Sequence, residues 1–301
     1  MAGKADSLKT IFYALGANFA IGVAKLGAAI ATGSSAMLAE AIHSFADCGN
    51  QALLLLGIKR AKRPPSPDFP LGYGKAIYFW SFIVALVLFS LGGLFSVYEG
   101  AHKLASTEPL STPWLAVGIL VFGIAAETVS LRACLAEIAK VRGKRSLWQW
   151  FRTSRQSELV VILGEDVAAE IGLALALIAV LAAIATGNPM YDALGSIAIG
   201  AVLIVVALGL AIEIKGLLIG QSAEPDTEAA IRRFLEERAE VEKVFRLITL
   251  QLGGTLMVSV KARVKGASAA ELVASINRVE AALRGAFPEV QWLFFEPDTA
   301  D

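Results

Sequence analysis

The sequence predicts an all-α membrane domain, a bundle of six transmembrane helices, followed by a small C-terminal α+β domain. Hydrophobic residues make up 56% of the 301 residues and charged residues only 18%, whereas about one-quarter is typical of soluble domains. The apolar residues are concentrated in six long stretches, and charged, amphipathic segments begin after Gly220. The sequence therefore divides into a transmembrane domain over residues 1–220 and a second domain over residues 221–301.

The six apolar stretches are each long enough to cross a bilayer, which takes about 20 mostly apolar residues. Turn-forming residues separate them, such as Pro64-Pro65 and Gly187-Asn188-Pro189. Glycines inside the stretches predict close packing between helices: Gly92, Gly93, Gly195 and Gly200. The predicted spans are about 8–31, 36–58, 76–100, 113–138, 159–186 and 191–219.

Basic residues between the spans predict the orientation of the chain. Thirteen lysines and arginines lie on one side of the six spans, whereas the other side has only Lys103. Cytoplasmic loops carry an excess of Lys and Arg, so both termini are expected in the cytoplasm, in agreement with an even number of spans. We expect an integral, multi-pass protein of a bacterial inner membrane.

The C-terminal 80 residues alternate between helical and strand patterns. Helices are predicted at about 225–239 and 268–285, and strands at 244–252, 256–264 and 290–295. The order αββαβ predicts a ferredoxin-like domain with its helices on one face of a sheet. Because the domain is short for independent stability, we expect dimerisation to support it.

Composition excludes several classes of function. Lys+Arg 27 and Asp+Glu 27 leave no net charge, which argues against nucleic acid as a partner. The two cysteines cannot form a thiolate zinc cluster, and there are two histidines, so any metal site must be rich in carboxylates. A membrane-embedded hydrolase is disfavoured because there is no G-x-S-x-G or zinc-protease helix motif. We expect no enzymatic activity.

Polar residues in the second span form one candidate metal site. His43 and Asp47 are four residues apart and share one helix face, and Asn50 and Gln51 lie one turn further on. An imidazole and a carboxylate at this spacing offer half of a tetrahedral site for zinc or a similar divalent ion. The alternative is that these side chains only form hydrogen bonds between helices.

Three acids in the fifth span form a matching cluster. Asp166 and Glu170 repeat the four-residue spacing, whereas Glu165 lies about 100° around the helix from Asp166. Acids inside a membrane are costly and repel one another, and a bound cation relieves both problems. Protons compete with metal for the same oxygens, so the chemistry of the site favours exchange of metal for protons.

Other charged residues in the spans have two interpretations each. Glu127 in the fourth span is either a proton relay or support for the ligands, or it pairs with Lys25 or Arg132. Lys25 itself is otherwise expected to extend to the membrane interface. Glu40 either lines the outward opening of the site or is a solvated acid near a helix N-terminus.

The segment Gly33–Asp47 resembles the second helix of the cation diffusion facilitator family, with a small-residue turn, an acid, then His43-Ser44 and Asp47. The segments Phe69–Lys75 and Asp192–Ile197 resemble other parts of the same family. This resemblance implies homodimeric efflux transporters that exchange zinc or a similar divalent cation for protons. Their metal site is formed by a pair of residues from helix 2 and a pair from helix 5.

The resemblance implies His43 and Asp47 as ligands, followed in order of preference by Asp166, Glu170 and Glu165. One nitrogen with several carboxylates suits zinc but also manganese, iron or cobalt, so these metals remain alternatives. We expect alternating access around one site, with Asn50, Gln51, Glu127 and Glu40 supporting the ligands or carrying protons.

The expected partners are the transported divalent cation, protons, the lipid bilayer and a second copy of the chain. No permanent cofactor is expected. Residues 222–301 contain no histidine, so we expect no tight zinc site there. A non-transporting metal sensor or assembly partner with the same fold is the alternative function.

Overall fold

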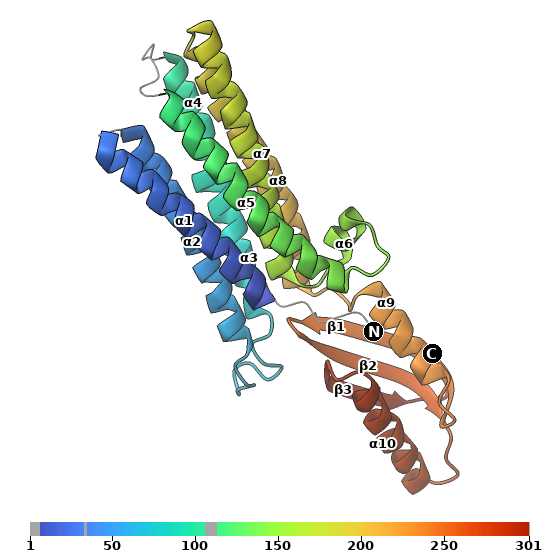
Figure 1. Ribbon diagram of the computed structural model, residues 1–301. Coiled ribbons are helices and arrows are strands. Elements are labelled where there is room, and N and C mark those ends of the chain that lie inside the picture. The colour runs from blue at the N-terminus through green and yellow to red at the C-terminus, as the bar shows by residue number, and fades with distance from the viewer. Residues whose placement is uncertain (1–6, 33–34, 106–112, 301) are drawn as a thin grey trace. The chain divides into compact units, whose positions relative to one another are not determined.

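The computed structural model describes residues 7–32, 35–105 and 113–300 of the chain (Figure 1). The chain forms two compact units. The first contains residues 1–57, 79–150 and 157–214, and the second contains residues 58–78, 151–156 and 215–301. Because the two units are interleaved along the sequence, the second unit joins short segments next to the spans to the C-terminal region.

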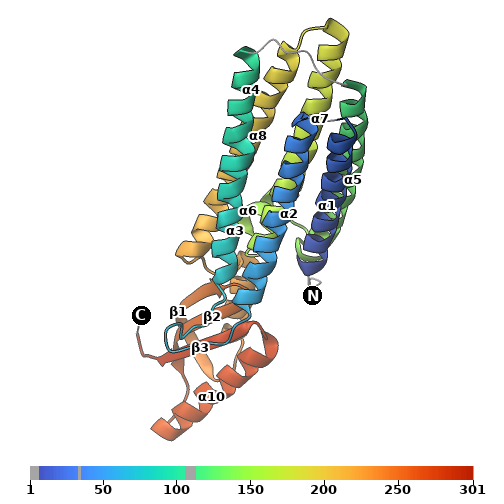
Figure 2. The ribbon, with the colours of Figure 1, turned by 90° about the vertical axis from the view of Figure 1, so that its left-hand side faces the viewer.

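The long helices follow the predicted spans. They are α1 (Ser7–Thr32), α2 (Ser35–Ala61), α3 (Ala76–Val87), the π-helical segment η1 (Leu88–Leu94), α4 (Phe95–Ala105), α5 (Pro113–Val141), α7 (Ser157–Thr186) and α8 (Met190–Ile219), with the short α6 (Leu147–Thr153) before α7. Both views show α5 alongside α1 and α7 (Figures 1 and 2). All six predicted stretches are helical, and the stretch 76–100 is a helix with a π-helical segment inside it.

Five helices of the described chain are long and apolar enough to cross a membrane. They contain residues 10–27, 76–104, 113–141, 157–186 and 190–219. Helix α2 has 27 residues, or about 40 Å of helix, which exceeds the bilayer core of about 30 Å. Its polar residues make it less apolar than the other five, so a sixth span stays a prediction.

Glycines allow several of these helices to approach closely. A Cβ added to Gly200 of α8 would lie 2.7 Å from the carbonyl oxygen of Gly93 and 2.8 Å from the backbone nitrogen of Val97. A Cβ added to Gly195 would overlap Ala179 of α7. The predicted close packing is confirmed for Gly93, Gly195 and Gly200, while Gly92 makes contacts of ordinary length.

The third apolar stretch contains seven residues of π-helix between two α-helices. The amide of Phe95 donates to the carbonyl of Ser90, five residues earlier, as well as to that of Gly92. Ser96 Oγ also donates to the Gly92 carbonyl at 2.6 Å, and Ser90 Oγ donates to the Leu86 carbonyl at 2.7 Å. These hydroxyls supply donors to carbonyls where the helix departs from regular α geometry.

The C-terminal region has the predicted order αββαβ. It contains α9 (Pro225–Glu236), β1 (Val241–Leu252), β2 (Thr255–Val264), α10 (Ala269–Ala286) and β3 (Val290–Pro297). The described strands form a sheet of order β1-β2-β3, in which β1 and β2 are antiparallel and β2 and β3 are parallel. The α+β class is confirmed, whereas the ferredoxin-like topology, whose full pattern is βαββαβ, stays a prediction.

Both helices of the C-terminal region contribute to one hydrophobic core. Alternate residues of β2 are buried, including Val258 and Val260, as the period of two in a strand requires. The helices add Ile231 and Leu235 from α9 and Val279 and Leu283 from α10. On the opposite face of the sheet Ile248 and Phe294 are half exposed.

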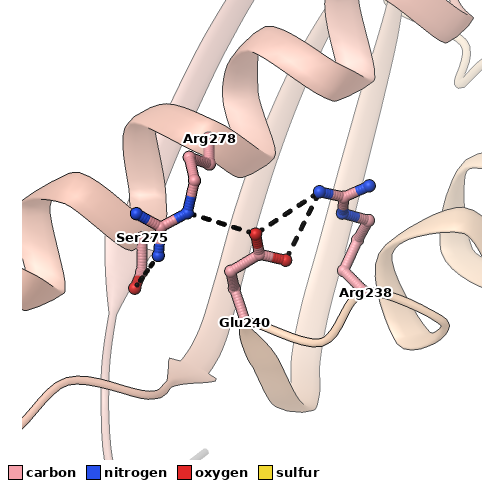
Figure 3. Close-up of polar contacts among 4 residues, drawn as sticks. All are labelled: Arg238, Glu240, Ser275 and Arg278. Carbon is pink, nitrogen blue, oxygen red and sulfur yellow. Dashed lines mark hydrogen bonds and ion pairs between the residues drawn. The ribbon is translucent and has the colours of Figure 1, made fainter.

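An ion-pair network joins α10 to the segment before β1 (Figure 3). Glu240 accepts a hydrogen bond from Arg278 Nε at 3.3 Å and pairs with Arg238 Nη2 at 3.4 Å, while Arg278 Nη2 donates to Ser275 Oγ at 3.0 Å. A hydrogen bond from its own backbone, together with Arg278 and Arg238, holds the pKa of Glu240 below its ordinary value. The network therefore favours the ionised carboxylate.

The loop between α2 and α3 packs on the turn between β1 and β2 within the second unit. Gly253 in that turn has a φ of 64°, and its amide donates to Tyr78 Oη at 3.0 Å. Trp292 Nε1 donates to the carbonyl of Leu71 at 3.2 Å. Next to these bonds, a Cβ on Gly74 would overlap the carbonyl oxygen of Leu252 and lie 2.7 Å from its carbonyl carbon. The backbone contact therefore requires glycine at position 74.

Candidate metal site

Polar side chains of α2 face α1 and α7. Asn50 and Gln51 are buried, and Gln51 Oε1 accepts a hydrogen bond from Asn18 of α1 at 3.4 Å. Asn50 Nδ2 donates to Glu165 Oε1 of α7 at 3.0 Å. Asp47, one turn before Asn50, is half-buried and interacts electrostatically with Glu165. This side of α2 is therefore turned toward the acidic segment of α7.

The acidic cluster of α7, which consists of Glu165, Asp166 and Glu170, accepts hydrogen bonds from two different helices. Glu165 is bonded to α2, whereas Asp166 and Glu170 are bonded to α5. Ser130 Oγ donates to Asp166 Oδ2 at 3.2 Å, and Thr128 Oγ1 donates to Glu170 Oε1 at 2.9 Å. The structure thus separates Glu165 from Asp166, as the 100° between neighbouring residues of a helix requires.

Two of these carboxylates have an unsatisfied oxygen. Glu165 Oε2 and Glu170 Oε2 are buried and have no hydrogen-bond partner in the described structure. A buried acceptor without a partner is costly, and polar groups in this state commonly mark a site for an ion or water. These oxygens are therefore available for a cation or a proton.

Glu127 of α5 lies within the same group of charges. It is buried and interacts electrostatically with Asp47, Asp166 and Glu170, and favourably with Lys25 of α1. Lys25 is 5% exposed, so the expectation that it extends to the membrane interface is wrong. A carboxylate nearby stabilises a buried ammonium, which favours the predicted alternative in which Lys25 pairs with Glu127.

The remaining predicted residues of α2 lie outside the described side chains. His43 and Glu40 belong to α2, but their side chains are not among those that the structure describes. Among the described side chains, no group of three His, Cys, Asp or Glu residues is arranged to hold a metal ion. The predicted ligand set, which includes His43, therefore stays a prediction.

Cys48, the neighbour of Asp47 in sequence, lies against α1. Cys48 Sγ lies 4.0 Å from the carbonyl oxygen of Leu15 in α1. This contact agrees with a packing role for Cys48, as its position about 100° from the His43 face suggests. Among the described side chains, the potential metal-binding atoms of the acidic cluster in α7 are oxygens, which suit hard or borderline divalent cations.

Similarity to a known protein family identifies the family of this chain. The cation efflux transmembrane domain matches residues 11–219. The chain belongs to the cation efflux family. This confirms the resemblance to the cation diffusion facilitators, a family of transporters, and it makes the chain an integral multi-pass membrane protein that is not an enzyme.

Individual relatives of this cation efflux protein agree with that assignment. The chain is 35% identical to the mitochondrial proton-coupled zinc antiporter SLC30A9 of Xenopus laevis over 76% of its length and 41% of the relative. It is 33% identical to the human protein of the same name over 74% of its length and 40% of the relative. It is 30% identical to metal tolerance protein C4 of Arabidopsis thaliana over 79% of its length and 53% of the relative. The chain thus spans about half or less of each relative.

Proposed function

We propose that this cation efflux protein exports zinc in exchange for protons by alternating access. The observation that carries the proposal is the acidic cluster of α7, in which buried oxygens of Glu165 and Glu170 have no partner in the described structure. Asp47 of α2 interacts electrostatically with the same cluster. Such a group attracts either a divalent cation or protons, and the two exclude each other because they occupy the same oxygens.

The proposed ligands are His43 and Asp47 from α2 with Asp166 and Glu170 from α7, and Glu165 is the alternative ligand. Its hydrogen bond with Asn50 places Glu165 on the α2 side of α7, which supports that alternative. Gln51, Glu127 and Glu40 are proposed to support these ligands or to carry protons. One imidazole with carboxylates fits zinc, and the similarity to two proton-coupled zinc antiporters supports zinc over manganese, iron or cobalt.

The proposal includes six spans, a membrane domain ending near residue 220, and both termini in the cytoplasm. It also includes a homodimer supported by a ferredoxin-like C-terminal domain, in a bacterial inner membrane. The charge asymmetry of the loops supports the orientation. The small C-terminal core, which has limited surface to bury on its own, supports dimerisation.

The test is metal transport by the purified protein in proteoliposomes with an imposed pH gradient. We expect zinc flux coupled to proton flux, and flux at the background level for Asp47→Ala, because one charged ligand is lost. Glu99→Ala is the matched control, since it removes a carboxylate of α4 outside the cluster. Absence of metal-coupled proton flux, or wild-type zinc flux in Asp47→Ala, refutes the proposal. Metal binding without any transport favours a sensor or assembly partner instead, and competition among the four metals identifies the substrate.

A further inference from the structure

Two hydroxyl groups of α5 hold two of the acids of α7. Ser130 Oγ donates to Asp166 Oδ2 at 3.2 Å, and Thr128 Oγ1 donates to Glu170 Oε1 at 2.9 Å. Both Ser130 and Asp166 are almost completely buried. The two bonds are in reverse order along the two helices: Thr128 precedes Ser130 in α5, whereas its partner Glu170 follows Asp166 in α7. Two hydroxyls two residues apart thus bind two carboxylates that are one helical turn apart.

A hydroxyl orients a carboxylate without cancelling its charge. A lysine or arginine at the same place would pair with the carboxylate and compete with a bound cation. Serine and threonine leave the negative charge in place and occupy one oxygen only. Glu170 shows the result most clearly, because its Oε1 is bonded to Thr128 while its Oε2 is buried without a partner in the described structure.

The hydroxyls are not needed to bring α5 and α7 together. A Cβ on Gly123 of α5 would lie 3.3 Å from the side chain of Leu173, so apolar contact already brings the helices close. Several other hydroxyls of the bundle donate to their own helix, as Thr186 does to the carbonyl of Ala182 at 2.7 Å, and the bond between Ser81 and Ser157 joins two helices without involving an acid. Thr128 and Ser130 are thus distinguished by donating across to acids, and both acids belong to the proposed metal site.

We propose that Thr128 and Ser130 are positioning residues that fix the orientation of Glu170 and Asp166 for metal binding. This inference rests on the proposed function. Residues that orient metal ligands through a hydrogen bond typically change metal affinity or activity by about 10- to 100-fold when they are substituted. Loss of either hydroxyl leaves its carboxylate free to rotate, so zinc affinity decreases even though every ligand remains present.

The test compares Thr128→Val and Ser130→Ala in the full-length protein. Valine keeps the branched shape of threonine, and alanine keeps the small volume of serine. Two measurements are made: the Kd for zinc of the detergent-solubilised protein by competition with a chelating dye, and the KM and maximal rate of zinc flux in proteoliposomes. We expect Kd and KM to rise about 10-fold or more in each variant, with a smaller change in the maximal rate.

Conservative variants and a matched control separate positioning from a structural role. Thr128→Ser and Ser130→Thr keep the hydroxyl and should restore most of the affinity. Ser196→Ala removes a hydroxyl that donates to the carbonyl of Asp192 in its own helix, and it should leave Kd and KM unchanged. A role in folding alone would instead lower the amount of folded protein and the maximal rate while KM stays constant.

The outcomes distinguish this inference from the proposed function. If the wild type exchanges zinc for protons but Thr128→Val and Ser130→Ala keep its Kd and KM, the positioning role is refuted and the proposed function stands. Equal increases in the Ser196→Ala control refute it as well. If the wild type neither binds nor transports a divalent metal, both proposals are refuted.

Discussion

Replacing Gly74 by alanine should detach the loop between α2 and α3 from the β1–β2 turn. The new Cβ would overlap the carbonyl oxygen of Leu252 and lie 2.7 Å from its carbonyl carbon, which are backbone atoms that cannot move away by a change of rotamer. The two segments must separate, and the bonds from Gly253 to Tyr78 and from Trp292 to Leu71 lengthen or break. At about 1 kcal/mol for each hydrogen bond, the contact loses about 2 kcal/mol.

A loss of this size changes the local opening equilibrium about 30-fold, since about 1.4 kcal/mol corresponds to a factor of ten. Hydrogen exchange measured by mass spectrometry on the full-length protein should show this acceleration in peptides covering residues 66–78 and the β1–β2 turn. The control is Gly254→Ala in the same turn, where an added Cβ meets open space. Equal exchange in Gly74→Ala and Gly254→Ala would show that the backbone contact does not hold the loop.

Three further perturbations test other parts of the structure. Gly200→Ala forces α8 away from the backbone of Gly93 and should destabilise the solubilised protein by about 1–3 kcal/mol. Its unfolding temperature should therefore be lower than that of the control Gly209→Ala, where the added Cβ has no neighbour. Equal unfolding temperatures would contradict the close packing. Because the pKa of Glu240 is lowered in the folded state, its ion pairs stabilise the fold above the unfolded pKa of about 4.3, and this contribution is lost as the pH falls through the folded pKa. Glu240→Gln should therefore lower the free energy of unfolding by at most about 1 kcal/mol near about pH 7 and leave it unchanged once the pH is below the folded pKa of Glu240. The measurement is hydrogen exchange of α10, and a pH-independent effect would exclude the ion pairs as its cause. Because residues 222–301 contain neither histidine nor cysteine, zinc titration of Asp47→Ala should show no remaining tight site, whereas stoichiometric binding that disappears on removal of that region would contradict this expectation.

The helices were predictable because their signal is local. Twenty or more consecutive apolar residues have few alternatives to a spanning helix, and the observed ends of α7 and α8 differ from the predicted ends by two residues or fewer. The C-terminal region was predictable for a related reason. Apolar and polar residues alternate along β2, and apolar residues recur on one face of α10 over several helical turns. The topology of its sheet depends on which strands pair, and periodicity does not determine pairing.

The environment of each acid was not predictable from spacing alone. Spacing identifies Asp166 and Glu170 as neighbours on one face of a helix, but it does not say which helix that face contacts. It also does not reveal hydroxyls that act across helices, because serine and threonine in a span can equally donate to the carbonyl four residues earlier. Ser96 does so, whereas Ser130 donates to α7, and only the packing of α5 against α7 distinguishes the two cases.

The π-helical segment Leu88–Leu94 has a consequence for comparing this chain with its relatives. A backbone hydrogen bond to the carbonyl five residues earlier, in place of four, accommodates one extra residue in the turn. A relative with a regular α-helix here would therefore be one residue shorter. Because the wider turn takes up that extra residue, side chains beyond the segment keep the same side of the helix in both proteins, whereas an ungapped alignment would misplace them by about 100° around the helix axis. An alignment gap at Gly92-Gly93 would then preserve the lipid-facing and protein-facing sides of α4, in a stretch whose amino-acid composition gives no sign of the extra residue.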